Sequence, residues 1–332
     1  MLSQQTIRLS LPSKGRLEID ALEFLSAAGL KIFKPNPRQY QAQLPALPEL
    51  GVIFQRPGDI VVSVRQGSID FGITGLDMLE EKRGDDGEIM ILHDSLGFGG
   101  CALTLAVPES WKEVKDVASL KKHSASMKAP LRIATKFPVL TERFLNRYDI
   151  SHTLIAAEGT LESAPAIGYA DMISDLVSSG QTLIDNRLRP LSDGVIQRSQ
   201  AVLIANRNAL QTRPDVLEMA RRLLEYIEAH LRAKDNLLVI ANMRGENPEV
   251  ITEQIFTQTD FGGLQGPTIS PIGVRDGSPN WYSVSIVVRR DLLPQAISQL
   301  RLIGGSGIIV SPLTYIFEEE PPRYKAMLNA LA

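Results

Sequence analysis

The stretch TIRLSLPSKGRLEIDALEFLSAAG (6–29) indicates the fold class of this chain. Apolar and polar residues alternate over Thr6–Leu11, which predicts a strand, and the tetrad Pro12–Gly15 predicts a turn. Apolar residues then recur at helical spacing over Ile19–Ala28, and Gly29 is typical of a helix end. A strand, a loop and a helix in this order form the repeating unit of an α/β sheet.

The same unit recurs further along the chain. The segment Ile69–Thr74 (IDFGIT) predicts a short buried strand followed by a loop and a helix. A second α/β unit is predicted to begin with the strand Leu131–Thr135 and the helix Phe137–Tyr148, and Ala201–Ala205 is one more strand after it. The charged segment Lys112–Lys128 is interpreted as a solvated surface stretch.

The last 100 or so residues have a different pattern. Asp215–Lys234 predicts a long amphipathic helix, because its apolar residues fall on one face. Strands and helices then follow in the order βαββαβ over Leu237–Pro312, which is the ferredoxin-like order. We therefore expect a separate small domain joined by the long helix, and a solvated tail at Glu318–Arg323.

Composition excludes several classes of protein. With 35 basic and 38 acidic residues among 332, the net charge of −3 gives no general attraction to nucleic acid or to an anionic membrane. An anionic ligand would need cations concentrated at one site and offset by acids elsewhere. The single cysteine excludes a disulfide scaffold, and the four histidines lack the spacing of a zinc protease. No stretch is typical of a signal peptide or a membrane-spanning helix, so we expect a cytoplasmic protein.

The segment DMISDLVSSGQTL (171–183) is the most informative for chemistry. Its strand places Asp175 near the carboxyl end, and the chain then turns through the small and polar residues of 178–182. Backbone N–H groups in such a turn can converge on an anion, and a carboxylate can accept two hydrogen bonds from a ribose diol. The segment predicts a site for a sugar phosphate such as a 5-phosphoribosyl group. A Ser/Gly-rich turn without a ligand is the alternative.

Other polar residues are expected at the same edge of the sheet, beyond the carboxyl ends of strands. Lys14 and Arg16 flank Gly15 and suit a polyphosphate, although a solvated turn is the alternative. Arg56, and the pair Asp70 and Asp77 around IDFGIT, are assigned to the same edge. Cys101, in GFGGCAL, is interpreted as a small buried residue beside a close backbone approach rather than as a nucleophile.

With these motifs the chain resembles the ATP phosphoribosyltransferase family in its long form, over essentially its whole length. The matching motifs are LPSKGRL (11–17), IDFGITGLDML (69–79), LGFGGCALTLAVP (96–108), RIAT (132–135) and GTLESAPAIGYADMISDLVSSGQTL (159–183). The C-terminal βαββαβ segment is similar to the regulatory domain of the long forms.

The resemblance implies an α/β fold with two catalytic domains of the periplasmic-binding-protein type, an active-site cleft, and a ferredoxin-like regulatory domain. The implied bounds are 1–106 with 198–212 for the first catalytic domain, 107–197 for the inserted second, 213–234 for the linking helix and 235–332 for the regulatory domain. The implied reaction transfers the 5-phosphoribosyl group of phosphoribosyl pyrophosphate to N1 of ATP with Mg²⁺, as the first step of histidine biosynthesis. It further implies inhibition by histidine and a homo-oligomer from dimer to hexamer.

The resemblance leaves the metal ligands open and also assigns residues to roles. Those for phosphoribosyl pyrophosphate are Glu162, Asp175, Ser178, Ser179, Gly180, Gln181 and Thr182. Lys14, Arg16 and Arg56 are assigned to catalysis, Asp77 and Asp94 to ATP, and Thr268, Gly305 and Ser306 to the inhibitor histidine. The sequence departs from the family pattern at Ser179, where threonine is usual, at Val61, where proline is usual, and by one extra serine in the N-terminal loop.

Two other functions remain open on the residues alone. A binding or sensor protein could share the two-domain cleft and would need no catalytic cations, and a catalytically silent paralogue could act as an interaction subunit. The predicted phosphate loop together with Lys14 and Arg16 favours phosphorylated substrates and hence the enzyme. Because N1 of adenine is a neutral nucleophile, we predict no essential general base.

Overall fold

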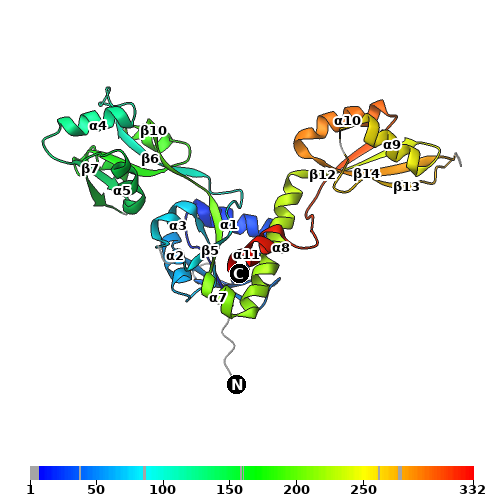
Figure 1. The fold of residues 1–332 in the computed structure, drawn as a ribbon, viewed down its shortest axis with the longest axis horizontal. Helices are drawn as coiled ribbons and strands as arrows, with labels where there is room; N and C mark the ends of the chain where they lie inside the picture. The colour runs from blue at the N-terminus through cyan, green and yellow to red at the C-terminus, as the bar shows by residue number, and fades with distance from the viewer. Residues whose placement is uncertain are drawn as a thin grey trace, which may run out of the picture. The chain divides into compact units, whose positions relative to one another are not determined.

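The computed structural model describes residues 7–36, 39–84, 87–157, 159, 161–260, 262–275 and 279–332 (Figure 1). The chain divides into two compact units, of which unit 1 takes residues up to 26, 30–222 and 322–332, and unit 2 takes 27–29 and 223–321. Within the described residues, no helix combines the length and the apolar character needed to cross a membrane.

Unit 1 contains two mixed sheets, and the first has the strand order β2-β3-β1-β4-β11-β5. Its strands are β1 (Ile7–Pro12), β2 (Gln41–Gln43), β3 (Leu50–Gln55), β4 (Phe71–Gly75), β5 (Ile89–His93) and β11 (Ala201–Asn206). β1 runs parallel to β3 and β4, whereas β11 lies antiparallel between β4 and β5. The connecting helices are α1 (Arg16–Ala27), α2 (Pro57–Arg65) and α3 (Leu76–Lys82).

The second sheet of unit 1 has the order β10-β6-β9-β7-β8. Its strands are β6 (Cys101–Pro108), β7 (Leu131–Thr135), β8 (His152–Ala156), β9 (Met172–Val177) and β10 (Leu188–Ser199), and its helices are α4 (Val117–Ser126), α5 (Pro138–Arg147), η1 (Leu161–Ser163) and α6 (Gln181–Asp185). β6 lies antiparallel between β9 and β10, as β11 does in the first sheet. In both sheets one antiparallel strand therefore lies next to an edge strand: β11 beside β5 in the first sheet and β6 beside β10 in the second.

Two segments of the second sheet differ from the sequence interpretation. The stretch interpreted as solvated contains α4, which buries Val117 and Leu120 and begins with a capping box between Asp116 and Ser119. The long strand β10 was not predicted, because Pro190 and a break in register between Pro190 and Val195 interrupt its alternation.

The C-terminal helix also differs from expectation. Unit 1 ends with α7 (Arg207–Thr212), the first part of α8 (Pro214–Lys234) and α11 (Pro322–Leu331). α11 packs against β5 and α7, and Arg323 forms an ion pair with Asp94 at 2.7 Å. Arg323 is therefore part of a docked helix rather than of a solvated tail, and this helix belongs to unit 1.

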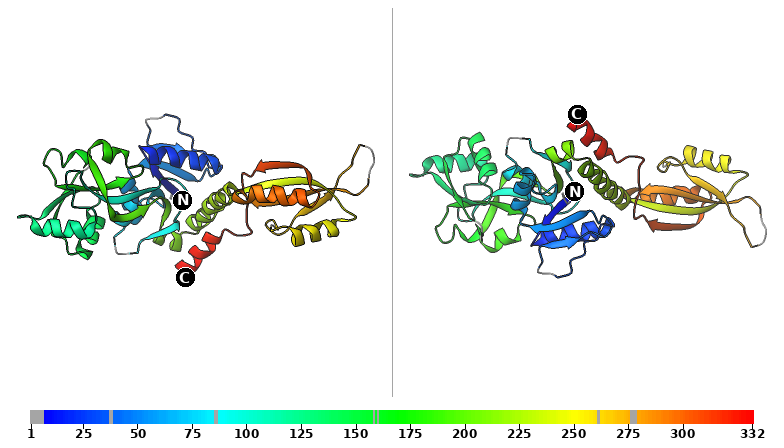
Figure 2. Two further views of the ribbon diagram at one scale, coloured as in Figure 1. Left: turned by 90° about the horizontal axis from the view of Figure 1, so that it is seen from above. Right: turned by 90° about the horizontal axis from the view of Figure 1, so that it is seen from below.

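Unit 2 confirms the predicted βαββαβ order. It consists of β12 (Asn236–Arg244), α9 (Pro248–Gln258), β13 (Thr268–Pro271), β14 (Trp281–Arg289), η2 (Arg290–Leu292), α10 (Leu293–Leu302) and β15 (Ser306–Pro312). The sheet order is β13-β14-β12-β15 with all neighbours antiparallel. Both long helices cover the same face, where Ile251 and Leu300 meet Val239 and Ile286 in one core (Figures 1 and 2).

Candidate active site

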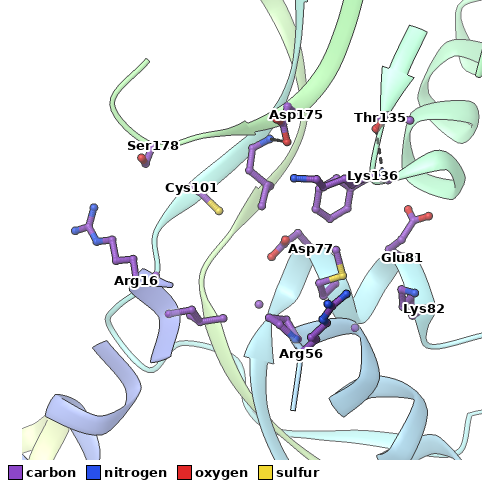
Figure 3. Close-up of a pocket in the computed structure, with 18 of the residues that line it drawn as sticks. Arg16, Arg56, Asp77, Glu81, Lys82, Cys101, Thr135, Lys136, Asp175 and Ser178 are labelled. Carbon is purple, nitrogen blue, oxygen red and sulfur yellow. Dashed lines mark hydrogen bonds between the residues drawn. The ribbon is translucent and has the colours of Figure 1, made fainter. Parts of the chain in front are cut away.

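A cavity of about 860 Å³ in unit 1 is lined by residues from both of its sheets (Figure 3). The first sheet contributes the segments after β1, β3 and β4, and the second contributes the segments after β7, β8 and β9. The polar and charged lining residues are Lys14, Arg16, Asp20, Arg56, Asp59, Asp77, Glu81, Lys82, Cys101, Thr135, Lys136, Asp175 and Ser178. The cavity therefore lies where strand ends gather, as expected for an open α/β sheet.

Six of the residues proposed from the sequence meet in this cavity, namely Lys14, Arg16, Arg56, Asp77, Asp175 and Ser178. Burial raises the pKa of Asp175 above its usual range, and the proximity of Glu162 raises it further. The backbone N–H of Leu176 and the charge of Lys136 act in the opposite direction. Glu162 is thus close enough to influence Asp175 although it is absent from the lining.

The rest of the predicted phosphate loop continues from Ser178 into the short helix α6. Gly180 precedes α6 with a positive φ of 78°, a conformation that glycine adopts without strain. The Ser179 hydroxyl accepts a hydrogen bond from the N–H of Gln181 at 3.4 Å, and the carbonyl of Thr182 accepts one from Asn186. The loop therefore leads from the cavity-lining Ser178 to a turn with its own internal hydrogen bonds.

Two of the acidic residues proposed from the sequence lie elsewhere. Asp94 is paired with Arg323 of α11 and does not line the cavity. Asp70 is at the amino end of β4, opposite to the edge assigned from the sequence, where it pairs with Arg213 at 2.7 Å and accepts the N–H of Arg8 at 2.9 Å. The assignment of Asp70 to the ligand site was wrong. Asp70 lies at the amino end of β4, whereas the cavity lies at the carboxyl ends of the strands.

The three residues proposed for histidine lie on opposite edges of the sheet of unit 2. Thr268 begins β13, whereas Gly305 and Ser306 lie at the start of β15. Two strands separate β13 from β15, which corresponds to roughly 14 Å at the usual strand spacing. One chain therefore does not bring Thr268 and Ser306 to the same small ligand.

The buried Asp77 and Ser199 form a small network with Cys101, which is half-buried at the cavity wall rather than fully buried as expected. The Ser199 hydroxyl donates to the Asp77 carboxylate and accepts the backbone N–H of Asp77 at 3.0 Å. Burial raises the pKa of Asp77, and burial together with the nearby Asp77 raises the pKa of the Cys101 thiol to about 11. Cys101 is protonated at neutral pH, which argues against a nucleophilic role.

The cavity has no formal excess of positive charge among its described residues. Five lysines and arginines line it together with five carboxylates. The expected excess of cations over acids in the cleft is therefore not found among these residues. All five cations, however, are exposed, whereas Asp77 and Glu81 are buried and hydrogen-bonded within the protein. An incoming anion therefore meets the cations more readily than it meets these two acids.

Comparison with known proteins agrees with this architecture. The HisG family model, described as ATP phosphoribosyltransferase, matches residues 56–229, and the model of the HisG C-terminal domain matches residues 233–315. The chain belongs to the ATP phosphoribosyltransferase family. It is therefore a pentosyl-transferring enzyme, and the second match confirms its resemblance to the long form.

Relatives in this family extend over most of the chain. ATP phosphoribosyltransferase 2, chloroplastic, of Arabidopsis thaliana is 44% identical over 340 residues, which cover 100% of this chain and 82% of that protein. The ATP phosphoribosyltransferase of Bradyrhizobium sp. (strain ORS 278) is 33% identical over 326 residues, which cover 95% of this chain and 95% of that protein. The solved ATP phosphoribosyl transferase (HisG:HisZ) complex from Thermotoga maritima has a TM-score of 0.52 at 25% identity, covering 67% of this chain and 98% of that one.

The described residues hold no group of three or more histidine, cysteine or acidic side chains that could bind a metal ion by themselves. Mg²⁺ commonly binds through one or two carboxylates together with substrate phosphates and water. Asp59 and Asp175 face the cavity and could supply such carboxylates. The residues of this phosphoribosyltransferase therefore fit a Mg²⁺ ion that arrives with its substrate.

Several charged residues of the cavity were not predicted from the sequence, among them Glu81, Lys82 and Lys136. Lys136 follows β7 directly, so the rule that ligands gather at strand ends could have found it. No sequence signal identifies Glu81, because its hydrogen-bond partners are 58 and 59 residues away on α5.

Proposed function

We propose that this cavity transfers the 5-phosphoribosyl group of phosphoribosyl pyrophosphate to N1 of ATP, releasing pyrophosphate, as the first step of histidine biosynthesis. The observation that carries the proposal is the meeting of Lys14, Arg16 and Arg56 from one sheet with Asp175 and Ser178 from the other in one cavity. The first set suits the phosphates of a leaving group, and the second suits a ribose 5-phosphate.

The reaction exchanges one bond at the anomeric carbon of the ribose. The N1 lone pair of adenine forms the new bond to C1, and the C1–oxygen bond breaks with its electron pair leaving on pyrophosphate. The proton that the 6-amino group loses passes to water. Because charge builds up on the leaving oxygen and on the sugar, the protein contributes by positioning both substrates and neutralising pyrophosphate.

The residues assigned from the sequence have proposed parts in this exchange. The Asp175 carboxylate accepts hydrogen bonds from the ribose diol, and the loop from Ser178 to Thr182 binds the 5-phosphate. Lys14, Arg16 and Arg56 contact pyrophosphate, and Asp77 is assigned to the binding of ATP. Bound Mg²⁺ would supply further positive charge to the leaving pyrophosphate.

The direct test is pyrophosphate release from ATP and phosphoribosyl pyrophosphate in the presence of Mg²⁺. We expect release only when both substrates are present, with one pyrophosphate formed per phosphoribosyl-ATP. Binding of both ligands without any release would instead support a sensor protein or a silent paralogue. Omitting Mg²⁺ and adding a chelator is expected to abolish release.

We also propose that free histidine inhibits through unit 2 without competing at the phosphate loop. Deleting everything after Lys234 would be a poor test, because it also removes α11 from β5 and α7. Thr268→Ala is expected to weaken inhibition, with Ser270→Ala on the same strand as the control. Equal inhibition of both variants and the wild type would exclude Thr268 from the histidine site.

We further propose a homo-oligomer between dimer and hexamer, which the resemblance to the long forms implies, and a cytoplasmic location, which the sequence predicts. Sedimentation velocity across protein concentrations would test the assembly. A monomer at all concentrations would contradict it.

A further inference from the structure

The helix α5 has no capping residue of its own. Its N-cap is Phe137, whose side chain offers no hydrogen-bond acceptor, and Pro138 at the first helical position has no N–H. The next two N–H groups, of Val139 and Leu140, donate to the two carboxylate oxygens of Glu81 at 2.9 and 3.0 Å. One carboxylate from α3 therefore satisfies the free N–H groups of the first turn of α5.

Glu81 occupies an electrostatically poor position on its own helix. It lies next to the last residue of α3, where the helix dipole disfavours an anion, and only 9% of it is exposed. Burial accordingly raises the pKa of Glu81, while the N–H groups of Leu140 and Val139 act in the opposite direction. The position is explained by its contact with α5, where the dipole favours a negative charge.

This contact joins two walls of the cavity. α3 carries Asp77 and Lys82, and the segment before α5 carries Lys136 and Phe137 (Figure 3). Met78 of α3 also packs against the apolar cluster that contains Phe137. The contact with Glu81 therefore fixes the position of the segment that holds Lys136.

The other end of that segment is fixed within the second sheet. The Thr135 hydroxyl accepts the N–H of Phe137 at 2.9 Å, and Thr141 bonds the buried Ser174 at 2.8 Å. Between these two anchors the Lys136 side chain is exposed and close enough to Asp175 to lower its pKa. Lys136 is thus a cation held beside the proposed ribose site.

We propose that Glu81 is a positioning residue, whose carboxylate holds the Lys136–Pro138 segment against α3 so that Lys136 binds a phosphate group of the substrates. The inference rests on the proposed function of the cavity and adds a residue pair to it. The phosphate can belong to the leaving pyrophosphate, to ATP or to the ribose 5-phosphate, which share the same chemistry.

The test is a double-mutant cycle on binding, measured by calorimetry with the full-length protein. Magnesium pyrophosphate, ATP and ribose 5-phosphate are the three probes, and the variants are Glu81→Gln, Lys136→Ala and both together. Glutamine keeps the length of the side chain, but only its one amide oxygen can accept a hydrogen bond. Its NH₂ group is a donor and cannot accept the second N–H of α5. Glu80→Gln, on the same helix and paired with Arg83, is the matched control.

We expect Glu81→Gln and Lys136→Ala each to weaken at least one probe about 10-fold, and the double variant to be no weaker than Lys136→Ala alone. The probe that loses affinity identifies the phosphate. The inference would be overturned if Glu81→Gln lowered the affinity equally in the wild type and in Lys136→Ala. It would also be overturned if no variant lost affinity for any probe.

Hydrogen exchange of the first turn of α5 provides a readout that does not depend on ligands. The Val139 and Leu140 amides are expected to exchange faster in Glu81→Gln than in Glu80→Gln. Should Glu81→Gln fail to fold, Glu81→Asp, whose carboxylate falls short of α5, replaces it in both experiments with the same expectations. Coupled binding losses without pyrophosphate release would contradict the proposed function while supporting this pairing.

Discussion

The two sides of the cavity differ in how they can recognise a ligand. The first sheet presents Lys14, Arg16 and Arg56, exposed side chains that act over a distance through their charge. The second sheet presents Asp175 and the Ser178 loop, whose positions are set by β9 and by the positive φ of Gly180. Recognition by charge tolerates small displacements, whereas recognition by hydrogen bonds to a sugar does not. Substitutions that keep charge but change length therefore separate the two sides.

The largest effect is expected on the second side. Asp175→Asn is predicted to lower kcat/KM about 1,000-fold, because two hydrogen bonds to a charged acceptor are lost or weakened at about 2 kcal/mol each. Asp175→Glu is predicted to lower it about 100-fold despite the conserved charge, because the longer side chain displaces the carboxylate by about 1 Å or more. Steady-state kinetics with phosphoribosyl pyrophosphate as the varied substrate would measure both.

Asp149→Asn is the matched control, because Asp149 is an exposed carboxylate that pairs with Lys121 at 3.3 Å outside the cavity. The pH profile gives an independent check. As pH falls through the raised pKa of Asp175, the carboxylate gains a proton and loses acceptor capacity, so kcat/KM of the wild type should fall. Full activity of Asp175→Glu would break the distinction between the two sides.

The next effect concerns Cys101, which lies in the cavity between the two sides. With its pKa raised to about 11 from the usual 9.0, its thiolate fraction at pH 8 is about 100-fold lower than that of an ordinary thiol. Alkylation by iodoacetamide should be slower by about that factor than for a cysteine peptide, with mass spectrometry as the measurement. Asp77→Asn should speed it, because the charge of Asp77 contributes to the raised pKa.

The sequence predicted those parts of the site that depend on a single strand and the residues after it. The cations of the first sheet and Ser178 follow strands whose hydrophobic pattern is clear, Asp175 lies near the end of such a strand, and all of them meet in the cavity. The order of elements in unit 2 was predictable for the same reason, because each strand and helix has its own periodicity.

Features that depend on distant partners were not predictable. Glu81 is functional only through the N–H groups of α5, and the partner of Asp94 is on the last helix of the chain. Thr268 and Ser306 were grouped from the resemblance, but the strand order of unit 2 places them on opposite edges. Sheet order and helix docking depend on packing between segments, which local pattern does not specify.

A smaller effect is expected on the first side. The side chain of Arg16 is 82% exposed and lies 3.5 Å from Asp20, so its contribution to binding an anion is a screened charge. Arg16→Ala is predicted to raise the KM for phosphoribosyl pyrophosphate about 10-fold at low salt and less at high salt, and Arg16→Lys to restore most of the affinity. Arg147→Ala, an exposed arginine at the end of α5, is the control. A loss in Arg16→Lys as large as in Arg16→Ala would show that geometry also governs this side.

The smallest effect is expected at Ser179, where the resemblance implies that threonine is usual. Ser179 is exposed, and its hydroxyl accepts a long hydrogen bond of 3.4 Å from the N–H of Gln181. Threonine keeps this hydroxyl and adds a methyl group in open surroundings, so Ser179→Thr should change KM less than about threefold. Ser179→Ala removes the acceptor and should raise KM further, by a factor of about five. If the methyl group alone weakened binding as much as loss of the hydroxyl, the loop would recognise its phosphate by shape rather than by donors and acceptors.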